Sequence, residues 1–211
     1  MNPLRRLYRA FWTLVSGPIH AYYLKLMKES CLCRIDGVAV CDMSIEQHLQ
    51  ADFLKLTSEA MALIKSTDAR RYRRVCLNLS YIVNSPLITP GNYDHKDRIC
   101  NVDYAKHFRS EDQQWNLRMF ACLLIHEATH GVITTRGILY QNDDRERIER
   151  LCHREEYRFA LRIDHGYANA SIGSFDPNRW KPYWEGSRQD RAAASWKRLR
   201  EGLMAFFKQT K

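Results

Sequence analysis

The chain has 211 residues, of which 33 are Lys or Arg and 24 are Asp or Glu, so its formal net charge is +9. Hydrophobic residues make up 45% and charged residues 27%, which is typical of a folded globular protein and excludes a disordered one. With nine glycines and six prolines, a collagen-like or linker-dominated chain is also excluded. We expect a single domain over residues 1–211, with basic helical arms at about 1–30 and 187–211.

No stretch approaches the roughly 20 apolar residues of a membrane span, and the apolar patch at 10–15 is shorter than the core of a signal peptide. The seven cysteines are odd in number, and several stand in apolar periodic segments. This pattern favours reduced thiols and a cytoplasmic location over a secreted disulfide framework. Cys31-x-Cys33 with Cys41 could clip a metal, but no second close pair completes such a site, so free thiols are favoured.

In chain order, apolar residues at helical spacing predict short helices over 4–15 and 22–27. A capping box, Ser44-x-x-Gln47, opens a longer helix that reaches Ile64. Alternation predicts a half-buried strand over 72–83, followed by a loop at 84–97 and a second short strand at 98–104.

A second capping box, Ser110-x-x-Gln113, predicts a helix to about His130, with Gly131 as its C-terminal cap and residues 132–140 extended or looped. This helix is apolar almost all round, which indicates a buried central helix. Asp143-x-x-Glu146 opens another helix to about 164, and a basic amphipathic helix over 190–208 closes the chain. Strands and helices in this order indicate an α+β fold.

The buried helix carries His126-Glu127-Ala128-Thr129-His130, which is an H-E-x-x-H motif. Residues i and i+4 lie one turn apart on one helix face, so both imidazoles can reach one Zn²⁺. Glu127 is offset by one residue, where its carboxylate can hold the metal-bound water and accept its proton. An unpaired carboxylate flanked by two histidines in a core helix would be costly to bury without a role.

This segment resembles the active-site helix of the zincin-like metallopeptidases, over residues 110–160. The resemblance implies a small mixed or antiparallel sheet packed on the motif helix, with a ligand-bearing helix following it. It further implies that His126 and His130 bind zinc and that Glu127 is the general base. Position 133 is Ile and position 136 is Arg, so the metzincin extension is absent.

The third zinc ligand is expected on the helix over 143–163. Glu149 follows His130 after eighteen residues, a gap similar to that of gluzincins, although Ile148 replaces their Asn. On a helical wheel, Glu149 and Glu156 lie at the edge of the buried face, and His153 borders it. Glu149 is favoured, Glu156 would fit the longer gap of other small zincins, and His153 suits a partner of a ligand. Four arginines on the opposite side form a solvent-facing ridge: Arg150, Arg154, Arg158 and Arg162.

A peptidase also needs an edge strand that pairs with substrate, for which 72–83 is the candidate, and a donor to the oxyanion. Tyr140, His165 and Tyr167 are candidates for that donor. The expected function is therefore a zinc peptidase acting on a peptide or protein, and hydrolysis of another amide stays open. The alternative is a nucleic-acid-associated protein with a structural or degenerate zinc site, closed by His153 or a Cys. Its basic ends could contact nucleic acid or anionic membrane weakly, although a solvated basic face is favoured.

Overall fold

The computed structural model describes residues 17–18, 20–44, 46–86, 89–138, 140 and 144–178. Over these ranges the chain is a mixed α+β protein, as the sequence predicts, with one five-stranded sheet. The terminal helices predicted over 4–15 and 190–208 lie outside the described residues.

The strands follow one another across the sheet in the order β1-β2-β3-β5-β4. The central pairs β2–β3 and β3–β5 are parallel, whereas β1 and β4 each run antiparallel to their neighbour, so the predicted mixed sheet is confirmed. Asp36 and Gly37, both with positive φ, form the tight turn between the first two strands. The strand bounds are β1 Cys31–Ile35, β2 Val38–Asp42, β3 Tyr81–Asn84, β4 Gly91–Asp94 and β5 Ile99–Val102.

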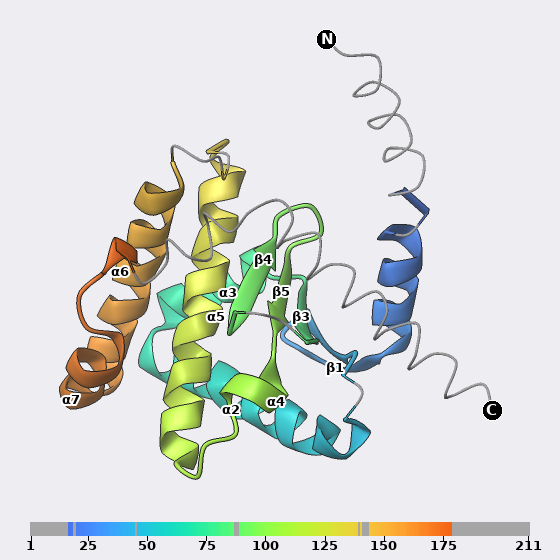
Figure 1. The fold of residues 1–211 in the computed structure, drawn as a ribbon, viewed down its shortest axis with the longest axis horizontal. Coiled ribbons are helices and arrows are strands. Elements are labelled where there is room, and N and C mark those ends of the chain that lie inside the picture. Colours follow the sequence, from blue (N-terminus) through green and yellow to red (C-terminus); the bar gives the residue numbers. More distant parts are fainter. Residues whose placement is uncertain are drawn as a thin grey trace.

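Helices cover both faces of this sheet (Figure 1). One face buries Val40 and Ile82 in a core shared with α2 (Gln50–Thr67), α3 (Ala69–Asn78) and α5 (Gln113–Thr135). The other face buries Ala39 and Val83 against a helix at 20–29, whose Met27 is fully buried. This part of the predicted N-terminal arm therefore packs on the sheet and belongs to the folded domain.

The remaining elements flank this core. The long helix α6 (Arg145–Ile163) packs along α5, so that α5 lies between α6 and the sheet (Figure 1). The short elements are η1 (Gln47–Leu49), α4 (Tyr104–His107), α7 (His165–Tyr167) and η2 (Ala168–Ile172).

The strand predicted over 72–83 is wrong, because residues 69–78 form helix α3 and only 81–84 form strand β3. Val75, Leu77 and Leu79 alternate, but Tyr72, Val75 and Leu79 also recur at helical spacing. The helical pattern prevails: these three side chains are buried, whereas Leu77 is 59% exposed. The second predicted strand, at 98–104, is present as β5.

The predicted helix boundaries need three corrections. The helix predicted from Ser44 begins as the 3-10 turn η1 at Gln47, without a side-chain cap. Asp112, not Ser110, caps α5 by accepting the Trp115 amide. Gly131 does not end α5, which continues to Thr135 and so includes part of the segment predicted as extended.

Gly131 has a packing role in place of the predicted capping role. A Cβ at this position would lie 2.7 Å from Asn78 Cβ and 2.8 Å from the Tyr93 hydroxyl. Glycine therefore lets α5 approach both α3 and β4 at the height of the H-E-x-x-H motif.

The helix α5 is held in place by an aromatic cluster at its N-terminal half. The Phe120 ring is fully buried and meets Phe108 and Phe53 edge-on, with ring centroids 5.0 and 6.3 Å away. We expect Phe120→Ala to lower the free energy of unfolding by about 3–5 kcal/mol. Leu77→Ala, at an exposed position, should change it by less than about 0.5 kcal/mol. Denaturant unfolding measures both, and equal effects would contradict this description of the core.

Candidate metal centre

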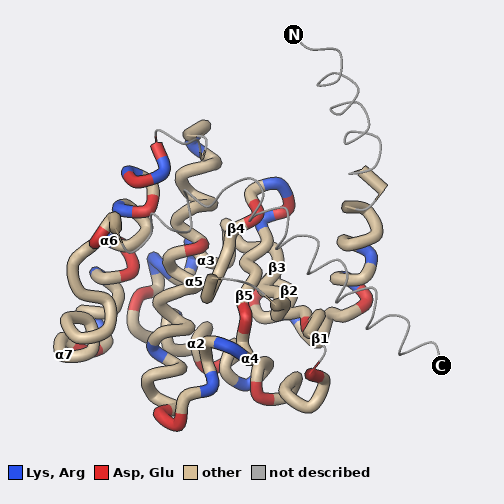
Figure 2. Tube along the Cα trace, in the orientation of Figure 1, with Lys and Arg blue, Asp and Glu red and all other residues tan. Residues whose placement is uncertain are grey.

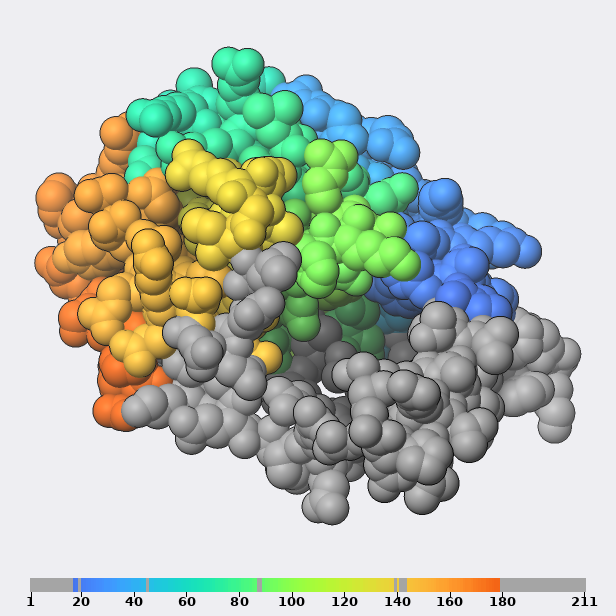
Figure 3. All heavy atoms as spheres, turned by 90° about the horizontal axis from the view of Figure 1, so that it is seen from above, coloured from blue at the N-terminus to red at the C-terminus, as the bar shows by residue number. Residues whose placement is uncertain are grey.

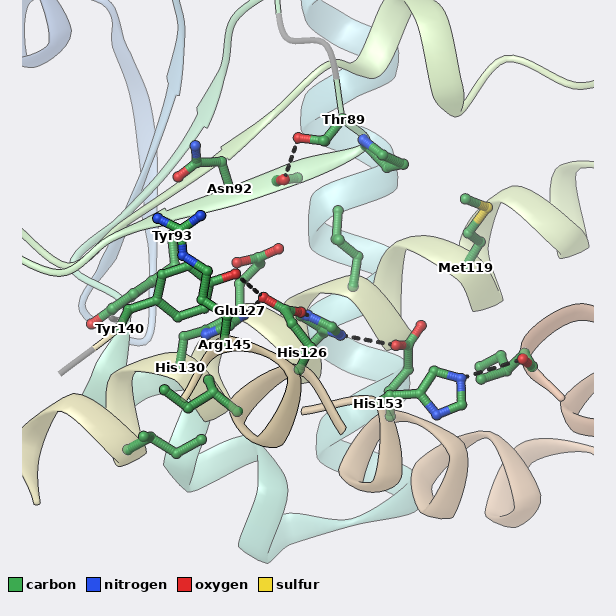
Figure 4. A pocket seen from close by; sticks show the side chains of 18 of the residues that line it. Thr89, Asn92, Tyr93, Met119, His126, Glu127, His130, Tyr140, Arg145 and His153 are labelled. Atoms are coloured by element: carbon green, nitrogen blue, oxygen red, sulfur yellow. Dashed lines mark hydrogen bonds and ion pairs between the residues drawn. The ribbon is translucent and has the colours of Figure 1, made fainter. Parts of the chain in front are cut away.

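The motif residues lie on the buried C-terminal half of α5. His126 and Glu127 are 5% and 4% exposed, and His130 is partly buried one turn later. The two imidazole rings have centroids 5.1 Å apart, as expected for i, i+4 side chains on one helix face. Figure 4 shows His126, Glu127 and His130 lining one cavity, each from this helix.

Glu149 of α6 faces both motif histidines. Its Oε2 lies 3.2 Å from His126 Nε2, and its Oε1 lies 3.6 Å from His130 Nε2. Glu149 is buried, and its carboxylate also accepts a hydrogen bond from the Tyr140 hydroxyl. Of the three candidates for a third ligand, Glu149 is the one that the structure places between the two imidazoles.

The other two candidates occupy different places. Glu156, two turns along α6, contacts His126 from the opposite side, with its Oε2 3.0 Å from Nδ1. A metal bound at Nε2 would take the place of the proton on that atom, while Nδ1 still donates its proton to Glu156. His153 lines the same cavity, but its Nε2 lies 3.4 Å from the Ile172 carbonyl oxygen and its ring packs on Phe175.

Residues 91–93 of strand β4 line one side of the cavity. The edge strand β4 lies beside the C-terminal part of α5, and Figure 3 shows the two next to each other at the surface. At Gly91, a Cβ would lie 2.9 Å from Glu127 Oε1 and 2.7 Å from Leu123 Cδ1, so the absence of a side chain lets β4 pack closely against the carboxylate. Tyr93, two residues on, stacks on His130 at 6.4 Å between ring centroids. The cavity has a volume of about 470 Å³.

The edge strand near the motif is therefore β4, and not the segment 72–83. The sequence contained little signal for it, because Pro90-Gly91-Asn92 is typical of a turn. An edge strand tolerates such residues, since only one of its sides must pair.

Burial and paired charges shift the titration of these groups. Burial raises the pKa of Glu127 to about 8 and lowers the pKa of His130 to about 4. Burial opposes charge on Glu149, but hydrogen bonds from His126 and Tyr140 together with the charge interactions with both histidines outweigh it and lower the pKa of that carboxyl to about 2. For His126, burial lowers the pKa, but hydrogen bonds to Glu149 and Glu156 together with the charges of Glu156 and Glu127 outweigh it and raise the pKa well above its usual value. The carboxylates of Glu149 and Glu156 thus both face His126, which favours positive charge at this position.

The donor set fits zinc. Ligand atoms about 2.0–2.1 Å from a tetrahedral zinc lie about 3.3 Å from each other. The separations of 3.2 Å between Glu149 Oε2 and His126 Nε2 and of 3.6 Å between Glu149 Oε1 and His130 Nε2 are close to that spacing, with one carboxylate oxygen facing each imidazole. A further donor that the sequence did not single out is the Cys152 thiol. Its Sγ and one nitrogen of each motif histidine lie within 4.8 Å of one another, a group that does not include Glu149.

Of the three candidates for an oxyanion donor, the structure places two at the cavity. Tyr140 and Tyr167 both line the cavity. Only Tyr140 of these two bonds a motif partner, through its hydroxyl on Glu149. His165 is exposed on α7, and it is not among the residues that line the cavity. Tyr140 is therefore the candidate that the structure brings to the site.

The predicted arginine ridge is exposed, as expected, but it is not a uniformly basic surface. Arg150 pairs with Glu146 at 2.8 Å, Arg158 with Glu155 at 3.2 Å and Arg162 with Asp68 at 3.0 Å. Figure 2 shows acidic and basic residues interleaved along α6. This pairing favours the interpretation of a solvated helix face over a nucleic-acid contact. All seven cysteines are free thiols in the structure.

Among the described residues, no helix combines the length and the apolar character needed to cross a lipid bilayer. Comparison of the chain with protein-family models, with curated proteins and with solved structures finds no match.

Proposed function

We propose that the chain is a zinc-dependent hydrolase of the zincin-like type, and specifically a metallopeptidase. His126, His130 and Glu149 are the proposed ligands, and Glu127 is the proposed general base. The observation that carries the proposal is the position of the Glu149 carboxylate, which faces the Nε2 atoms of both motif histidines at 3.2 and 3.6 Å. Two histidines and one carboxylate form a common ligand set of catalytic zinc, in which the fourth position is left for water or substrate.

Zinc, when bound, would lower the pKa of a water molecule and polarise a substrate carbonyl. The chain's own residues then have separate tasks. Glu127, beside the ligands in the same cavity, takes the proton of the attacking water and delivers it to the leaving amine. Glu156 holds the Nδ1 side of His126, which fixes the orientation of that ring.

The cavity also offers a place for an extended peptide. The β4 strand pairs with β5 on one side, and among the described residues no strand pairs with its other edge, where a peptide could add as a further strand. Its Gly91 packs against the Glu127 carboxylate, so this strand runs close to the proposed general base. A peptide that pairs with this edge would pass its backbone over the general base, which favours a peptide over other amides as substrate.

The proposal predicts hydrolysis that depends on the metal. Purified wild-type protein should contain close to one zinc per chain by plasma mass spectrometry. Incubated with a proteome-derived peptide library, it should generate new peptide termini that mass spectrometry detects. A zinc chelator should abolish this cleavage, and added zinc should restore it. Cleavage that persists after the metal has been removed would contradict the proposed mechanism.

A second candidate function rests on one observation, the buried Cys152 thiol beside the two histidines. Four protein ligands are typical of structural zinc, which holds no substrate. In that case the protein would be a binding or regulatory protein, for example one associated with nucleic acid, and zinc would be present without any cleavage of the peptide library.

A further inference from the structure

A buried cysteine without a role in the proposed hydrolysis faces the metal centre. Cys152 lies on α6, three residues after Glu149, and it is fully buried. Residues i and i+3 of a helix are neighbours on its surface, so Glu149 and Cys152 point to the same side. That side packs on α5, and the Cys152 Sγ and nitrogens of His126 and His130 lie within 4.8 Å of one another.

We propose that Cys152 is a fourth zinc ligand, which closes the metal centre of the resting protein. The inference rests on the proposed zinc site and concerns its regulation. His153, the other residue considered for this position, contacts the Ile172 carbonyl and packs on Phe175. Cys152 is therefore the residue of α6 whose ligand atom forms a compact group with nitrogens of both motif histidines.

Charge balance supports a thiolate in this position. On binding, the thiol would transfer its proton to solvent and the sulfur would donate an electron pair to zinc, with no change in oxidation state. The zinc dication, one carboxylate and one thiolate then sum to zero net charge. A neutral cluster is less costly to bury than a charged one, and these ligands are buried.

Closure has a consequence for activity. Four protein ligands leave no position for water or for the substrate carbonyl. Wild-type protein should therefore cleave peptides slowly, because the Cys152 sulfur must leave the metal before substrate can bind there. Removing the thiol should open the site.

Cobalt substitution tests this ligand directly, because a thiolate bound to Co²⁺ gives an intense charge-transfer absorption in the near ultraviolet. We expect this band in cobalt-loaded wild type, its loss in Cys152→Ala, and its retention in Cys122→Ala. Cys122 is a matched control, since it is also fully buried, on α5. Zinc affinity, measured by competition with a chelating dye, should fall at least about tenfold in Cys152→Ala and stay unchanged in Cys122→Ala.

The outcomes separate this inference from the proposed function. A wild-type protein that binds cobalt without the band would overturn the role of Cys152, whatever its activity. The band in wild type, with no peptide cleavage by wild type or Cys152→Ala, would support Cys152 as a ligand and contradict the hydrolase. Faster cleavage by Cys152→Ala than by wild type would support both. X-ray absorption at the zinc edge of the wild type needs no variant: a sulfur neighbour at about 2.3 Å supports the ligand, and its absence overturns it.

Discussion

Replacing Glu127 by Gln is expected to abolish peptide hydrolysis while zinc stays bound. General acid–base catalysis by one side chain contributes about 10²–10⁴-fold, so kcat should fall by about that factor. The amide keeps the shape of the side chain but cannot take a proton from water. Zinc should remain because His126, His130 and Glu149, which face one another, are all retained.

The fold should tolerate this change. The amide fills the same space as the carboxylate and places no charge in this buried position. Glu59→Gln makes the same chemical change at an exposed position of α2 and should leave activity and zinc content unaltered. Rates on a cleaved library peptide, together with metal analysis, measure the effect. Glu127→Gln protein that lost zinc but kept activity would show that the roles are assigned wrongly.

The sequence predicted the centre of the molecule well, because local and tertiary preferences agree there. The apolar residues around the motif fit a buried helix, and α5 is buried along most of its length. The alternation of arginines with apolar residues on the following helix predicted its orientation, and Arg154 is exposed while Ile148 is buried. In such segments one helical period accounts for both burial and exposure.

The wrong predictions lie at positions where contacts with residues distant in the sequence decide the structure. Gly131 is typical of a helix end, but here glycine is needed because Asn78 and Tyr93 leave no room for a Cβ. Leu77 completes an alternating pattern although it faces solvent. Gly91 stands in a turn-like sequence, yet it belongs to the strand above Glu127. No local pattern contains the contacts that decide these three positions.

At the candidate site, too, some features follow from the local sequence and others depend on tertiary contacts. The motif defines a pair of histidines, and the helical wheel narrowed the carboxylates to Glu149 and Glu156. The choice between these two carboxylates depends on how α6 crosses α5. The crossing determines which side of the His126 ring each carboxylate contacts. Cys152 joins the cluster for the same reason. Helix crossing follows from side-chain packing across the interface, which the linear order of residues does not display.

The proposed ligands and their outer partners should differ clearly in their effect on zinc affinity. His126→Ala, His130→Ala and Glu149→Ala should each remove most of the bound zinc, because each deletes a donor atom. Glu156→Ala should weaken binding less, by about 10–100-fold, since its carboxylate holds the far side of the His126 ring. His153→Ala should have a small effect, because its Nε2 is directed to the Ile172 carbonyl.

Thermal unfolding with and without zinc makes this order measurable and separates it from misfolding. A ligand that binds only the folded state adds about 2.7 kcal/mol at a free concentration of 100 times its Kd. Wild type should therefore show a large zinc-dependent rise in Tm, Glu156→Ala a smaller rise at the same zinc concentration, and Glu149→Ala almost none. Melting in the presence of chelator shows whether each variant folds without metal, so a low Tm there identifies a folding defect. If Glu156→Ala removed the zinc-dependent rise and Glu149→Ala retained it, Glu156 would be the third ligand, and the geometry around His126 would have to rearrange when metal binds.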